Sequence, residues 1–433
     1  MAAKPANMPS TADRDQTIST SITALTEAQQ TRNAIYYGLL IAVGYLAAPI
    51  AYIDLIHASM FDTMGASKTV ANLPTATAAV FGLVPLFAAW LIPSTRYIKF
   101  TISMGYSLTG LSVLLVAVAL AIDTSDEIRI VVTIVHAAIL MACYGTAGIF
   151  LWEVVIRSIP ENKRGKVFSV AFGVGPFLAV ASAAGAQRLL GEDLDKQDLL
   201  QRFALVFFSA ALVFFLKALL VWRLYVPPVA EVEAREPFAD FMLGGIRNFL
   251  TSPILVGLAV ASLLLMTGLT AMNNELLQVD EVIGVESAEV AGWSTGLRYA
   301  GKGVAAIALG LLLSRFGPRA PALGTSILLV SAVVWAMVVR GYPYLITFAL
   351  FGAGELGGLY YPHFVAAASN VDRVKRNLAI YSILGTLGYF AAVAHGWLAD
   401  HFGSMSSNLL ALGAAVVALC IIASLPRRPT PVT

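Results

Sequence analysis

The sequence predicts an all-α integral membrane protein of twelve transmembrane helices, arranged as two pseudo-symmetric six-helix bundles. Of its 433 residues, 58% are hydrophobic and only 12% are charged, whereas about 25% charged residues are usual in a soluble domain. Apolar runs recur from residue 35 to residue 426, and with about 20 residues each they are long enough to cross a bilayer. This composition argues against a water-soluble protein.

The apolar runs fall into six before a polar linker and six after it. They cover residues 35–57, 69–92, 98–121, 130–157, 167–190 and 203–225, and then 249–272, 291–314, 320–339, 342–368, 377–399 and 406–426. We therefore expect a disordered tail at 1–34, a six-helix bundle at 35–224, a linker at 225–248, a second bundle at 249–426 and a second tail at 427–433.

The two halves also repeat a pattern of glycine and arginine. Gly145, Gly148 and Arg164 recur 209 residues later as Gly354, Gly357 and Arg373. Both sets occupy the fourth helix of a half and the basic loop after it. Internal repeats of this kind are typical of transporters.

Lysine and arginine in the short loops predict the orientation, because cytoplasmic loops are enriched in them. With the N-terminus inside, the inner loops and the C-terminal tail hold Arg96, Lys99, Arg157, Lys163, Arg164, Lys166, Arg315, Arg319, Arg373, Lys375, Arg376, Arg427 and Arg428. The outer loops are mainly acidic, with Glu275 and Asp280 among their residues. Both termini are thus predicted to be cytoplasmic. The excess of arginine over lysine in an alanine-rich chain favours a bacterial inner (plasma) membrane.

Several functional classes find no support in the sequence. A net charge of +2 is too small to indicate nucleic-acid binding, and Cys143 and Cys420 lie in apolar runs of opposite halves. There is no clustered metal-ligand pattern, nucleophile motif or phosphate loop, so we expect no metal, no cofactor and no enzymatic activity.

One inner loop carries a motif with a family resemblance. Residues 310–319 read GLLLSRFGPR, with Gly310, Arg315, Gly317 and Arg319 as the defining positions. The segment resembles the signature loop of the major facilitator superfamily, in which glycine, three residues, an acid, arginine, any residue and glycine precede basic residues. Ser314 stands where that family has the acid.

Two looser patterns support the same resemblance: Pro160 to Gly165 after the fourth helix, and Gly396 to Gly403 at the outer end of the eleventh. The resemblance implies a monomeric secondary transporter with a central cavity and alternating access to its two sides. It also implies that residues 310–319 form a gating loop, in which Gly310 permits a tight helix approach and the charges hold neighbouring helix ends in one conformation.

Ionisable residues inside the apolar runs are the strongest candidates for a site, because each costs about 3 kcal/mol at the centre of a membrane helix. Arg298 and Lys302 lie four residues apart and so share one helix face. Glu355 lies among glycines in the tenth run, which would let another helix or a substrate come close. We expect Lys302 to pair with Glu355, and Arg298 to extend toward the outer surface.

Further candidates lie nearer the helix ends. Asp54 in the first helix is a candidate for proton coupling, and Glu153 is expected either to pair with Arg157 four residues on or to face the cavity. Asn273 and Asn274, at the outer end of the seventh helix, either bind substrate or cap a helix. Lys217 is expected to be structural, because the sixth helix is peripheral in the family.

These residues together suggest transport of a small organic, negatively charged solute, with protons as a coupling ion. Lys302 and Arg298 would attract the negative group, and Glu355 would neutralise them when the solute is absent. Two alternatives stay open: an efflux pump for lipophilic compounds, which needs few buried charges, and a transporter-like receptor that binds a solute without moving it. The partners expected are therefore the solute, protons and the lipid bilayer.

Overall fold

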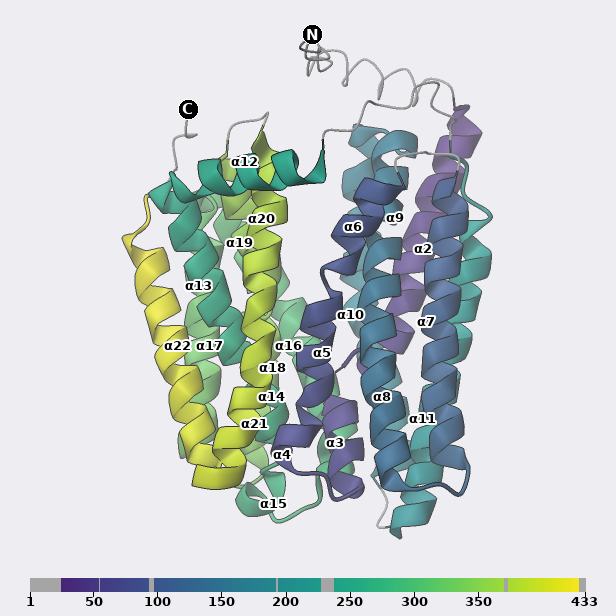
Figure 1. The fold of residues 1–433 in the computed structure, drawn as a ribbon, viewed down its shortest axis with the longest axis vertical. Coiled ribbons are helices and arrows are strands. Elements are labelled where there is room, and N and C mark those ends of the chain that lie inside the picture. Colours follow the sequence, from purple (N-terminus) through teal and green to yellow (C-terminus); the bar gives the residue numbers. More distant parts are fainter. Residues whose placement is uncertain are drawn as a thin grey trace.

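Helices that run side by side in alternating directions make up the computed structural model, which describes residues 25–53, 55–92, 97–191, 194–226, 237–369 and 373–427 (Figure 1). The first half contains six crossings, several of them built from more than one helix. The first is α2 (Glu27–Ala51) with α3 (Leu55–Thr63), the second is α4 (Lys68–Ala71), α5 (Leu73–Phe81) and α6 (Val84–Leu91), and the third is α7 (Ile98–Ala121). The fourth is α8 (Asp126–Ile139), η2 (Leu140–Tyr144) and α9 (Gly145–Ser158), the fifth is α10 (Glu161–Leu190), and the sixth is α11 (Lys196–Val221).

The second half repeats this arrangement after α12 (Phe238–Leu250), a helix that lies across one end of the bundle (Figure 1). The seventh crossing is α13 (Pro253–Leu269), α14 (Met272–Leu276) and α15 (Val279–Val282), the eighth is α16 (Ser287–Phe316), and the ninth is α17 (Arg319–Val338). The tenth is η3 (Tyr342–Leu345), α18 (Ile346–Gly354) and α19 (Gly357–Ala367), the eleventh is α20 (Val374–Thr386), η5 (Leu387–Phe390) and α21 (Ala391–Phe402), and the twelfth is α22 (Ser404–Ser424).

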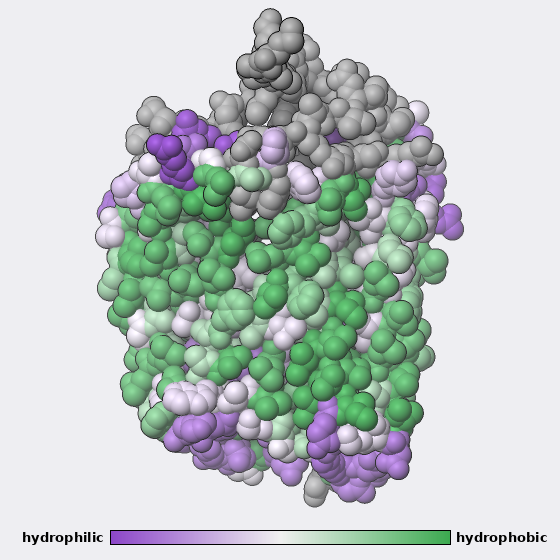
Figure 2. Space-filling view, in the orientation of Figure 1, coloured by the Kyte–Doolittle hydropathy of each residue, from purple (hydrophilic) through white to green (hydrophobic). Residues whose placement is uncertain are grey.

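The protein is a multi-pass membrane protein. Ten of its helical segments are long and apolar enough to span a membrane, and α10 and the α18–α19 pair complete the predicted twelve. The described residues contain no strand. Figure 2 shows the consequence at the surface: on the face in view, apolar side chains form a wide belt across the middle of the molecule, and hydrophilic side chains gather toward both ends. The all-α, twelve-helix prediction is confirmed.

The first helix begins earlier than the sequence predicted. Residues 27–34 were assigned to a disordered tail, but α2 starts at Glu27, where Thr26 and Gln29 form a capping box. The side chain of Asn33 then holds the end of the sixth crossing: its Nδ2 donates to the carbonyl oxygen of Tyr225 at 2.8 Å and its Oδ1 accepts from the N–H of Tyr225 at 2.7 Å. The polar composition misled the prediction, because the capping box and the pairing of buried Asn33 with Tyr225 stabilise a helix that composition alone does not reveal.

The two halves are joined at the end of the bundle that lies opposite α12, which we call the distal end (Figure 1). Here Asp400 of α21 accepts hydrogen bonds from the backbone N–H groups of Lys68 and Thr69 at 2.9 and 2.8 Å, so a carboxylate caps the short helix α4 across the interface. Gly396 makes the approach possible, because a Cβ there would lie 2.5 Å from the carbonyl oxygen of Lys68. The contacts between the halves continue along α10 and α16.

Candidate functional site

A break in the tenth crossing places the buried carboxylate. Helix α18 ends at Gly354 and α19 begins at Gly357, so Glu355 lies in the junction. Two glycines bring this crossing against α16: a Cβ on Gly352 would lie 2.0 Å from the carbonyl oxygen of Arg298, and a Cβ on Gly301 would lie 2.1 Å from that of Ala349. The backbones therefore approach more closely than any larger residue would permit.

This close approach assembles a triad of charged side chains. The Nε of Arg298 donates to Oε1 of Glu355 at 2.5 Å, and the Nζ of Lys302 donates to Oε2 at 3.1 Å. The side chains of Arg298 and Glu355 are each 14% exposed, and that of Lys302 is 31% exposed. The predicted pairing of Lys302 with Glu355 is present, but Arg298 does not extend to the surface and instead makes the shorter contact.

Within the triad, Arg298 and Lys302 share the single carboxylate of Glu355. Ionised groups are costly in the membrane, so charges at this depth are kept for pairing or for function. Lys302, the most exposed of the three, is the side chain that a solute could reach.

Tyrosines lie beside the triad and connect the two halves. Tyr299, next to Arg298 on α16, packs edge-on against Tyr45 of α2 with ring centroids 6.3 Å apart. Tyr45 fits because a Cβ on Gly175 of α10 would lie 2.1 Å from its ring. These aromatic rings combine an apolar face with a hydroxyl group, as ligand-binding surfaces commonly do.

A second pair of tyrosines, both in the first half, is joined by a hydrogen bond. The hydroxyl of Tyr52, just beyond α2, donates to that of Tyr144 at 2.5 Å. Tyr144 ends the single π-helical turn η2 in the fourth crossing, a local distortion that is frequent at functional sites. The turn was not predicted from the sequence, because no residue within it forces the extra hydrogen-bond register.

Lys217 of α11 lies against this tyrosine pair, and sequence reasoning had set it aside. Its side chain is 1% exposed, and its Nζ lies 4.3 Å from the ring centroid of Tyr106 and 4.8 Å from that of Tyr144. Gly44 leaves the space, since a Cβ there would lie 2.8 Å from the ammonium nitrogen. Among the residues that the structure describes, no carboxylate pairs with Lys217.

Other predicted residues lie apart from the triad. Arg157 pairs with Glu153 at 2.7 Å within α9, as the spacing predicted. Asp54 lies outside the described residues. Within the described ranges, no three His, Cys, Asp or Glu side chains gather as ligands for a metal ion.

Asn273 and Asn274 neither cap a helix nor lie with the triad. They belong to the distal closure, a set of polar contacts between the halves made by Lys68, Thr69, Asn72 and Thr75 with Asn273, Asn274, Asp400 and Ser404. Asn72 donates to Oδ1 of Asn274 at 2.7 Å. The two asparagines thus hold the halves together at the distal end.

Glu275, which follows them, was counted among the acidic residues of an outer loop. The side chain is instead fully buried and accepts a hydrogen bond from the hydroxyl of Tyr344 at 2.5 Å. One feature of the sequence does indicate that Glu275 is buried: the apolar residues Leu276 and Leu277 follow it directly.

The predicted gating loop joins α16 to α17 at the end of the bundle near α12. Arg315 is 13 residues beyond Lys302 along α16, or roughly 20 Å away along the axis. Gly317 ends the helix with φ +81°, a conformation that favours glycine. Gly310 differs from the family expectation: a Cβ there would meet only the Tyr360 hydroxyl at 3.9 Å, so no tight helix approach depends on it.

Comparison with known proteins finds matches among solved structures only. No protein-family model matches the sequence, and no curated protein matches it. Solved structures do match. They include a mutant of the nucleoside transporter NupG (TM-score 0.70, 10% identity, 90% of this chain and 98% of that chain) and a D-xylose-proton symporter (TM-score 0.66, 15% identity, 89% and 97%).

A third match is the major facilitator superfamily transporter FucP in the outward conformation, with a TM-score of 0.61, 14% identity, and coverage of 91% of this chain and 100% of that chain. At identities this low the likeness establishes the fold. The chain has the major facilitator fold that the resemblance of its loop predicted.

Proposed function

We propose that this chain, built on the major facilitator fold, is a secondary transporter of a small organic anion. The observation that carries the proposal is the Lys302 ammonium, which is 31% exposed and lies 3.1 Å from the Glu355 carboxylate between α16 and the α18–α19 junction. The nucleoside, xylose and fucose transporters among the structural matches are consistent with a small organic solute.

The surroundings of the triad refine the chemistry of this solute. Tyr299 and Tyr45 present aromatic rings next to Arg298, and Tyr144 and Lys217 lie beyond them in the first half. We expect a carboxylate or phosphate group at Lys302 and an apolar or ring portion against the tyrosines. The tyrosines also favour the second candidate, efflux of a lipophilic compound, which differs in needing no negative group.

Alternating access would follow from breaking and remaking the distal closure. The contacts of Asp400 with Lys68 and Thr69 hold the halves together at the distal end, which corresponds to the outer side in the predicted orientation. Opening the outer side requires these hydrogen bonds to break while contacts form at the other end. Solute binding assists this exchange only where it favours the closed intermediate.

Protons are the proposed coupling ion, in keeping with the proton symporters among the structural matches. Glu275 is buried next to the distal closure and accepts a hydrogen bond from Tyr344, and Asp54 is the candidate that the sequence offers. Uptake that neither acidifies the vesicle lumen nor responds to an imposed pH gradient would exclude this part of the proposal.

A screen of thermal stability tests the substrate class first. The purified protein is melted with panels of organic anions, neutral sugars and lipophilic cations, because a solute that binds the folded state raises the melting temperature. We expect stabilisation by anions, and a smaller effect of the same anions on Lys302→Met. Stabilisation by lipophilic cations alone would instead support the efflux pump.

Uptake into proteoliposomes then separates transport from binding. A stabilising anion should accumulate in vesicles that contain the wild-type protein, whereas the Lys302→Met protein should insert equally well and transport little. Binding without any flux would favour a receptor over a transporter.

A further inference from the structure

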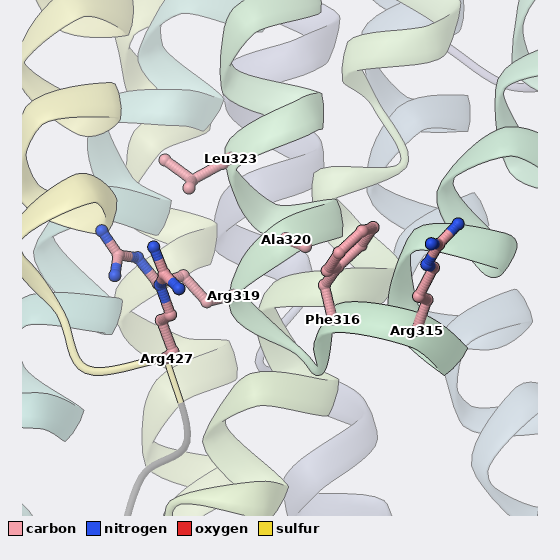
Figure 3. A pocket seen from close by; sticks show the side chains of 6 residues that line it. All are labelled: Arg315, Phe316, Arg319, Ala320, Leu323 and Arg427. Carbon is pink, nitrogen blue, oxygen red and sulfur yellow. The ribbon is translucent and has the colours of Figure 1, made fainter.

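Three arginines converge on one cavity at the end of the bundle near α12. Arg315 lies in the last turn of α16, Arg319 begins α17, and Arg427 follows α22. They line a cavity of about 680 Å³ together with Phe316, Ala320 and Leu323. Figure 3 shows Arg319 and Arg427 reaching toward the same space, with Arg315 on the other side of Phe316.

The arginines have no carboxylate partner in the described part of the chain. The only side-chain hydrogen bond among them runs from Nη2 of Arg319 to the carbonyl oxygen of Ala423. The Nε of Arg319 is buried and makes no hydrogen bond. Ser314, at the position of the acid in the signature loop, donates to the carbonyl oxygen of Leu311 at 2.9 Å. Three positive charges thus line one cavity, and no carboxylate of the described residues pairs with them.

The other residues that line the cavity are apolar. They are Leu323, Ala320 and Phe316, of which Phe316 is 54% exposed and lies between Arg315 and the other two arginines (Figure 3). Leu311, one turn before Arg315, is 67% exposed. A ligand in the cavity therefore meets guanidinium groups and an exposed aromatic ring, with an exposed apolar part of α16 one turn away.

We propose that this cavity binds the headgroup of an anionic phospholipid. The phosphate would accept hydrogen bonds from Arg319 and Arg427, which can each offer several N–H groups to an oxyanion, and the acyl chains would lie along Phe316 and the exposed side of α16. An inorganic phosphate ion would use the arginines but would leave the apolar wall without a partner. The site lies in the inner leaflet if both termini are cytoplasmic, and it does not depend on which solute is transported.

Binding of added lipid to the purified full-length protein in detergent tests this proposal by native mass spectrometry. Phosphatidylglycerol should bind more tightly than phosphatidylcholine. The variant Arg315→Gln/Arg427→Gln, which keeps Arg319 and its contact with α22, should bind phosphatidylglycerol about 25-fold more weakly, since each arginine near an anionic surface contributes about fivefold, or about 1 kcal/mol. Arg247→Gln on α12 removes one charge at the same end outside the cavity and should leave binding unchanged.

Several outcomes would overturn the proposal. Equal binding of the two lipids by the wild-type protein would show that the cavity is only apolar. A loss in Arg247→Gln equal to that in the double variant would show that charge at this end acts without a site. Inorganic phosphate that competes as well as the lipid would show an anion site that does not require acyl chains. Should the double variant fail to fold, Arg315→Gln alone, which alters an exposed side chain, is expected to lower binding about fivefold.

Discussion

Replacing Glu355 by glutamine should destabilise the protein by leaving two cations without their carboxylate. Arg298 and Lys302 carry two positive charges against one negative charge, so the substitution raises the net charge of the triad from +1 to +2. Removing one partner of a buried ion pair costs about 3–5 kcal/mol. Lys302 keeps some hydration at 31% exposure, so we expect the lower end, about 3 kcal/mol.

A second substitution should offset this loss. Lys302→Met together with Glu355→Gln removes one charge of each sign and returns the net charge of the triad to +1, so the double variant should be more stable than Glu355→Gln. Lys302→Met by itself keeps the 2.5 Å contact between Arg298 and Glu355 and should melt near the wild type. Transport should nevertheless be lost in all three variants, because each of them removes at least one charged side chain of the triad.

Thermal unfolding in detergent micelles measures these differences, and the same preparations are assayed for uptake. Glu281→Gln is the matched control, since Glu281 is 60% exposed and lies 3.5 Å from Lys68; exposed pairs contribute at most about 1 kcal/mol. If Glu355→Gln melted with the wild type, or if Lys302→Met deepened the loss, the triad would not be a coupled set of charges.

Other substitutions test the remaining features of the site. Lys217→Met should lower anion uptake at least about tenfold (about 1.4 kcal/mol). Its melting temperature should be unchanged or raised, because the substitution removes a buried charge. A lower melting temperature with normal uptake would assign Lys217 a structural role. Gly301→Ala should cost about 1–3 kcal/mol by overpacking, whereas Gly413→Ala, with no atom within 4 Å of the added Cβ, should not destabilise. Asp400→Ala should weaken the distal closure by about 1 kcal/mol. A cysteine placed at position 407 should then be labelled about fivefold more by a membrane-impermeant thiol reagent added from outside. Unchanged labelling would show that Asp400 does not control opening of the distal end.

The sequence was sufficient for the fold because lipid imposes a simple rule. Each crossing needs about 20 apolar residues, and loop charges divide inner from outer ends, so helix number and halves follow from one-dimensional patterns. The start of α2 was missed because its first residues are polar, and only the contacts of Asn33 with Tyr225 show why they are helical.

The candidate site was only partly predictable. Lys302 and Glu355 stood out as charges inside apolar runs, but Arg298 was misplaced, since its distance to Glu355 depends on Gly352 admitting the backbone of α16. Lys217 was set aside because the sixth helix is peripheral in the family. A membrane helix is apolar on both its lipid-facing and its buried side, so the sequence does not tell which way a lone lysine points. Its burial among Tyr106 and Tyr144 is a tertiary feature.

Solute exchange in proteoliposomes tests the central proposal most directly. Vesicles loaded with an unlabelled anion that stabilises the protein are diluted into the same anion carrying a label, and uptake is followed for the wild type and for Lys302→Met at equal protein content. We predict that label enters vesicles containing the wild-type protein and is nearly excluded from those containing the variant. Exchange at the wild-type rate in Lys302→Met would contradict the assignment of the triad, and specific binding without exchange in the wild type would contradict transport.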